Sequence, residues 1–138
     1  MPVFTVPPSL YADWSCKASP PISQGVCGAC YAIAALESIS MTKRIRGLSV
    51  NFLSIQEVIS CGSNNFDLNG CLGGYFSGAY NYAQNFGIGQ SSLYYYDDKA
   101  KYEGVLSPCD LTFTKNLLYE RSRQFIKEGV RIRFGDCA

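Results

Sequence analysis

The chain has 138 residues, which suffice for one domain with a buried core, and its formal net charge is only +1. So small a charge argues against nucleic acid or an anionic membrane as a partner, and no apolar run approaches the ~20 residues that a membrane span requires. Seven cysteines in so short a chain favour disulfide bonds and an oxidising compartment, lysosomal or secreted, and their odd number leaves at least one free thiol.

The first predicted elements are an extended segment and a long helix. Residues 1–23 hold five of the six prolines and lack the basic and long apolar regions of a signal peptide. We therefore expect either a mature N-terminus or a truncated gene model. Residues 30–46 carry apolar side chains at helical spacing, with basic residues in the last turn and Gly47 after it, which predicts a helix.

Two shorter helices are predicted next. Residues 54–60 form the first, because Ser54 and Glu57 have the spacing of a capping box. Residues 62–74 are expected to be a turn-rich loop, and residues 77–85 a third helix.

The pattern changes after Cys109, so we divide the chain into residues 1–109 and a divergent tail, residues 110–138. In the tail, residues 116–127 have helical spacing and residues 130–134 alternate as a strand. Two interpretations fit equally. The tail opens a second, β-rich domain, or it derives from a frameshift or an unspliced intron.

Cys30 is the leading candidate for chemistry. It begins the predicted 30–46 helix, where unpaired backbone N–H groups and the helix dipole stabilise a thiolate. Its spacing from Cys27 also fits a redox pair or half a metal site, but the sequence offers neither a second close cysteine pair nor a histidine. We therefore expect a nucleophile, with no metal and no cofactor. The carboxylates show no paired spacing for acid–base work, as at Asp67, Asp97 and Asp98.

The residues around Cys30 resemble those of the papain family of cysteine peptidases. Residues 27–31 read Cys-Gly-Ala-Cys-Tyr and fit the family signature C-G-[SA]-C-[WY]. Gln24 precedes this run, and Gln-Glu-Val-Ile-Ser-Cys at residues 56–61 and Gly-Cys-Leu-Gly-Gly-Tyr at residues 70–75 follow it in the family's order. Within the family, the sequence is most similar to the cathepsin C, or dipeptidyl peptidase, branch, in which Tyr follows the nucleophile.

This resemblance implies a fold and a site. The fold would be α+β and papain-like, mainly the helical left domain, with the β-rich right domain largely missing. Cys30 would be the nucleophile, and Gln24 would donate a hydrogen bond to the developing oxyanion. The implied substrate-binding residues are Gly73, Gly74 and Tyr75, the last at the edge of the S2 pocket. The implied disulfides are Cys27–Cys71 and Cys61–Cys109, which leaves Cys16 and Cys137 without an assigned partner.

Histidine occurs nowhere in the sequence, although the family's mechanism needs an imidazole to move protons. The leading hypothesis is a partial peptidase that acts on peptides or proteins and receives its histidine from a separate light chain. One alternative is a truncated, inactive product. Another is a non-catalytic module that binds peptides or protease inhibitors.

Overall fold

The structure, a computed structural model, describes residues 13–62 and 68–125. Its elements in chain order are η2 (Ser15–Lys17), α1 (Cys30–Ile45), α2 (Ile55–Cys61), η3 (Gly70–Leu72), α3 (Phe76–Phe86), η4 (Lys99–Glu103), α4 (Leu111–Thr114) and α5 (Leu117–Ser122). The described residues pair only through isolated β-bridges, so this part of the chain is helical and contains no sheet. Within it, no helix is both long enough and apolar enough to cross a membrane.

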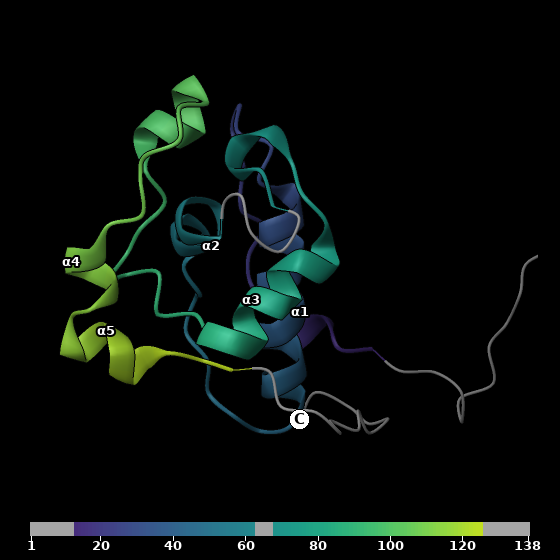
Figure 1. Cartoon of the computed structure of the whole chain (residues 1–138). Coiled ribbons are helices and arrows are strands. Elements are labelled where there is room, and N and C mark those ends of the chain that lie inside the picture. The colour runs from purple at the N-terminus through teal and green to yellow at the C-terminus, as the bar shows by residue number, and fades with distance from the viewer. Residues whose placement is uncertain (1–12, 63–67, 126–138) are drawn as a thin grey trace, which may run out of the picture.

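Helices α1 and α3 form the centre of the core, with α2 beside them (Figure 1). The buried face of α1 consists of Tyr31, Ala32, Ala35, Leu36, Ile39 and Ser40. The small alanine side chains of α1 let α3 approach closely. Helix α3 also buries small residues, namely Gly78, Ala79 and Ala83. The prediction of a helix over 30–46 agrees with α1 to within one residue, and the predicted 77–85 helix is one residue shorter than α3 at each end.

Helix α2 is buried along almost its whole length. Ser54 caps it as predicted, since the Ser54 hydroxyl oxygen accepts a hydrogen bond from the Glu57 backbone N–H at 3.1 Å. The other half of the expected capping box does not form. The Glu57 side chain turns into the core instead, where the hydroxyl of Tyr82 donates to it at 2.6 Å.

Two disulfides have both of their cysteines among the described residues, and they are the two pairs that the family resemblance implies. Cys27 is bonded to Cys71, with 4.6 Å between their Cα atoms, and Cys61 is bonded to Cys109, with a Cα separation of 4.7 Å. Cys137 lies outside the described residues, as do residues 63–67 of the predicted turn-rich loop.

The tail folds differently from the prediction. Its first helix, α4, has no counterpart in the predicted elements, and α5 ends at Ser122, well before the predicted end at residue 127. The helix stops because Arg123 adopts an extended backbone and Gln124 pairs with Ile88. The predicted 130–134 strand lies outside the described residues.

Candidate active site

Cys30 is the first residue of α1, and its side chain is an exposed free thiol. The residue before it, Ala29, is the N-cap and offers no side-chain acceptor to the first turn. The first N–H groups of α1 give this end of the helix a partial positive charge. The predicted position of Cys30 at a helix start is confirmed, and its role as a nucleophile stays a prediction.

The loop before Cys30 is fixed by the segment that contains η4. The hydroxyl of Tyr96 donates to the backbone carbonyl of Gln24 at 2.6 Å, and the backbone N–H of Val26 donates to the Lys101 carbonyl at 2.8 Å. Gly25 lies between them with a φ of +68°, and a Cβ there would come within 1.9 Å of the Lys101 oxygen. Only glycine fits this position, and the two hydrogen bonds on either side of it tie the loop that carries Gln24 to the segment around η4.

The Gln24 side chain is half-buried, and its Oε1 atom is buried without a hydrogen-bond partner among the described residues. A buried amide oxygen that accepts no hydrogen bond lowers the stability of the fold. The role of the Gln24 side-chain amide as the donor to the oxyanion stays a proposal.

Gly73 and Gly74 are glycines for different reasons. Gly73 has a φ of +104°, and nothing lies within 4 Å of where its Cβ would be, so its surface is open. At Gly74 a Cβ would approach the side chains of Leu68 at 3.0 Å and Tyr31 at 3.2 Å. Packing alone therefore accounts for Gly74, while Gly73 leaves room beside its backbone. The adjacent Tyr75 side chain is 70% exposed.

Tyr31 anchors the start of α1 to η3. Its hydroxyl donates to the backbone carbonyl of Gly70 at 2.7 Å, and its ring is buried. Burial first, and then the negative charges that Cys30 and Tyr96 would carry, raise the pKa of Tyr31 to about 12. The side chain is therefore neutral at physiological pH and serves to hold the nucleophile helix against the segment that carries the two glycines.

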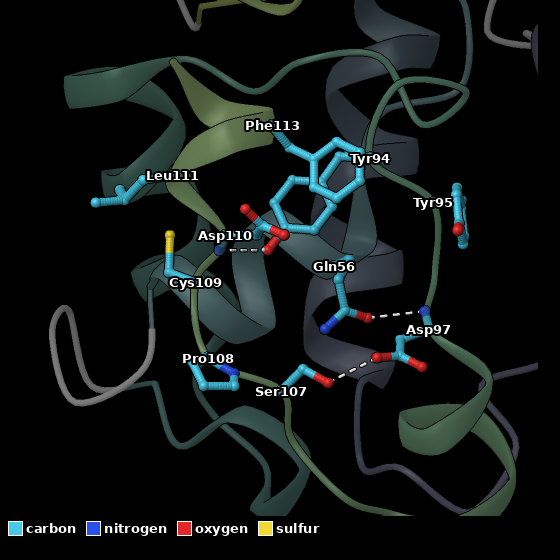
Figure 2. A pocket seen from close by; sticks show the side chains of 10 residues that line it. All are labelled: Gln56, Tyr94, Tyr95, Asp97, Ser107, Pro108, Cys109, Asp110, Leu111 and Phe113. Atoms are coloured by element: carbon cyan, nitrogen blue, oxygen red, sulfur yellow. Dashed lines mark hydrogen bonds between the residues drawn. The ribbon is translucent and has the colours of Figure 1, made fainter. Parts of the chain in front are cut away.

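A separate pocket of about 470 Å³ lies between α2 and the start of α4, and neither Cys30 nor Gln24 lines it (Figure 2). In it the Ser107 hydroxyl donates to the Asp97 carboxylate at 2.6 Å. That bond, followed by one from the Lys99 backbone N–H, lowers the pKa of Asp97. Asp97 thus organises the loop, a role that no local sequence pattern reveals because Ser107 lies ten residues away. Nowhere in the described ranges do three or more metal-binding side chains come together.

An exposed thiol at the start of a helix, directly after a loop tied down by hydrogen bonds, is typical of cysteine-dependent enzymes. Comparison with known proteins gives the family. The family model described as "Papain family cysteine protease" matches residues 8–130. The chain belongs to the papain family of cysteine proteases.

Individual relatives agree, but over only part of their length. The chain is 39% identical to cathepsin O of Mus musculus over 75 residues, 53% of this chain and 23% of that protein. It is 33% identical to papain of Carica papaya over 94 residues, 67% of this chain and 26% of papain. It thus spans about a quarter of each of these relatives.

Solved structures show the same partial match. A cysteine protease of Carica candamarcensis in complex with E-64 aligns with a TM-score of 0.59 and 28% identity, over 72% of this chain and 44% of that one. A structure from a study of the mite allergens Blo t 1 and Der p 1 aligns with a TM-score of 0.60 and 29% identity, over 78% and 34% of the two chains. The helical fold of this chain is therefore similar to part of a papain-like structure.

Proposed function

We propose that this chain is the nucleophile-bearing part of a papain-type peptidase, which hydrolyses peptide bonds through a thioester on Cys30. The observation that carries the proposal is the exposed Cys30 thiol at the start of α1, next to a loop that contains Gly25 and is held by hydrogen bonds to Tyr96 and Lys101. We also propose that residues 1–109 belong to the family's helical domain. The substrates would be peptides or proteins.

The chemistry follows from these groups. The Cys30 thiolate attacks the carbonyl carbon of the peptide bond, and the Gln24 side-chain amide and the Cys30 backbone N–H stabilise the oxyanion that forms. Such a donor typically accounts for ~10²- to 10³-fold in rate. The C–N bond then breaks, the amine leaves with a proton, and water hydrolyses the thioester to release the acid and restore the thiol.

The proton that the leaving amine needs must come from outside these 138 residues, because they contain no histidine. The imidazole would belong to the rest of a longer chain or to a separate light chain. A groove on the described surface supports the docking of such a partner. Two adjoining pockets have six lining residues in common, and we call the surface that these residues form the apolar groove. The residues are Pro20, Pro21, Ile22, Phe52, Leu53 and Ile55.

Two finer proposals concern specificity and location. Tyr31 after the nucleophile and the Ser-Pro-Cys run at residues 107–109 support the cathepsin C branch, and release of dipeptides from a substrate with a free, but not a blocked, N-terminus would test it. The relatives reported above carry other names, so this placement rests on those residues and on the similar stretches at residues 56–61 and 82–88. Two disulfides support an oxidising compartment, lysosomal or extracellular.

Complementation tests the proposal. The chain is mixed with a polypeptide that carries the family's catalytic His and the Asn that orients it, and peptide hydrolysis is followed with wild-type chain and with Cys30→Ala. We expect turnover only from the wild-type mixture and none from either component alone. Turnover by the isolated chain that is lost in Cys30→Ala would contradict an external base. Saturable peptide binding without turnover in any mixture would favour the non-catalytic binding module.

A further inference from the structure

We propose that residues 111–125 form a strap that closes the helical domain by docking on the buried carboxylate of Glu57. The strap comprises α4, α5, the two residues between them and the three residues after α5, and Figure 1 shows α4 and α5 on the left of the view, to one side of α1, α2 and α3. This proposal concerns how the domain is closed and does not depend on catalysis by Cys30.

The first argument is the environment of Glu57, whose side chain has no exposed surface. Two donors come from the helical domain itself, the Tyr82 hydroxyl at 2.6 Å and the Gly89 backbone N–H at 3.2 Å. Two more come from the strap, the Tyr119 hydroxyl and the Arg123 guanidinium, whose Nη1 lies 2.7 Å from Oε2. Arg123 is the cation that pairs with Glu57, and a buried carboxylate without a cation is strongly unfavourable.

The second argument is that Arg123 binds more than Glu57. Its Nη1 also donates to the carbonyls of Phe86 at 3.3 Å and Gly87 at 3.0 Å, at the C-terminal end of α3. Helix C-termini favour cations, because their last carbonyls are unpaired. The Nη2 atom donates to the Thr114 carbonyl at 3.3 Å. One guanidinium therefore joins α2, α3 and α4.

The third argument is the fit of the backbone and of two glycines. Ile88 and Gln124 exchange reciprocal backbone hydrogen bonds at 2.9 and 2.8 Å. A Cβ on Gly89 would lie 2.3 Å from the Tyr119 ring, and a Cβ on Gly87 would lie 2.9 Å from the Phe125 ring. Gly89 does not adopt a left-handed conformation, so its backbone does not require glycine. The space that its missing side chain leaves is filled by the strap.

These contacts place the strap in the helical domain rather than at the opening of a second one. The boundary that the sequence suggests at residue 109 would then lie beyond residue 125. The helical domain would close on itself through the strap, and a second domain would have to dock on a surface elsewhere.

A matched pair of arginine substitutions tests the strap in the full oxidised chain. Arg123→Gln leaves Glu57 buried without a cation and should lower the melting temperature by roughly 10 °C. Arg121→Gln, which removes the same charge from the exposed face of α5, should change it little. Hydrogen exchange should show protected Ile88 and Gln124 amides in the wild type and in Arg121→Gln, and faster exchange of both together in Arg123→Gln.

Two further variants keep the test decisive if Arg123→Gln does not fold. Gly89→Ala should push Tyr119 away and speed exchange of the same two amides without altering any charge. Adding Glu57→Gln to Arg123→Gln should recover part of the lost melting temperature, because the uncompensated charge is gone. Equal melting temperatures for the two arginine variants, or Ile88 and Gln124 amides that exchange as fast as exposed ones in the wild type, would overturn the proposal.

Discussion

Tyr31 shows at the scale of one residue how the site is held together, because it links the nucleophile helix to η3 through a buried hydroxyl. Its folded-state pKa of about 12 exceeds the unfolded value of about 10, so folding favours the neutral phenol. The stability that this group contributes is fully present below pH 10 and is lost as the pH rises towards 12. We expect NMR titration of a ring-labelled sample to give the raised pKa, and the melting temperature to fall over the same window.

Tyr31→Phe is the control for this prediction. The variant loses the hydrogen bond to Gly70 and should be less stable at pH 8, but its melting temperature should fall less between pH 10 and 12. Some alkaline loss should remain, because burial also raises the pKa values of Tyr82 and Tyr119. A Tyr31 that titrates near 10 in the folded protein would contradict the burial argument.

Residue-scale prediction from the sequence succeeded where a signature fixes local chemistry and failed where packing decides. The position of Cys30 at a helix start follows from residues next to it in the chain. The difference between Gly73 and Gly74 does not, because it depends on how the side chains of Leu68 and Tyr31 pack against Gly74 in the fold. The prediction that the Glu57 side chain completes a capping box was wrong for the same reason. Glu57 instead accepts a hydrogen bond from Arg123, which is 66 residues away in the sequence.

At the scale of elements, two helix N-caps should differ in their contribution to stability, although a side-chain oxygen accepts a backbone hydrogen bond in both. The two caps are Ser54 of α2 and Asn116 of α5. The Ser54 hydroxyl is fully buried, accepts from the Glu57 N–H and donates to the Tyr94 carbonyl at 2.6 Å. Ser54→Ala removes the partner of the Glu57 N–H and of the Tyr94 carbonyl, and it should lower the free energy of unfolding by about 2 to 3 kcal/mol. Asn116→Ala removes the exposed cap of α5 and should cost about 0.5 to 1 kcal/mol.

Denaturant unfolding of both variants measures the difference. Equal costs would mean that the Tyr94 carbonyl finds another donor when Ser54 is lost. Local and long-range contacts also differ in what the sequence can predict. Helices α1, α2 and α3 could be predicted from the sequence, and the end of the tail's second helix could not. The first three have apolar periodicity or a local cap, whereas the end of α5 is set by the pairing of Gln124 with Ile88.

For the whole molecule, the two described disulfides should dominate stability. They join residues 44 and 48 positions apart, and closing a loop of that size contributes about 4 kcal/mol on the chain-entropy model. Two such bridges approach the total stability of an ordinary domain. We therefore expect reduction to unfold the chain. Peptide mapping without reduction should recover Cys27–Cys71 and Cys61–Cys109, with Cys30 alkylated, and a Cys27–Cys30 bond would turn the interpretation towards redox chemistry.

The apolar groove should also govern how the isolated chain behaves in solution. Ile22 and Phe52 are 43% and 46% exposed within one concave surface, and monomers seldom leave large contiguous apolar patches uncovered. We expect sedimentation velocity to show concentration-dependent association of the 138-residue chain, which Ile22→Ser combined with Phe52→Ser should weaken. The control is Leu117→Ser with Leu118→Ser, since these leucines are 64% and 62% exposed but lie on the short helix α5, away from the groove. If only the leucine pair weakens association, the self-association surface lies on the strap. The apolar groove would then no longer support the docking of a histidine-bearing partner. A response confined to the groove pair would tie self-association to the surface that we propose receives the histidine-bearing partner, and that partner should then suppress the association when it is added.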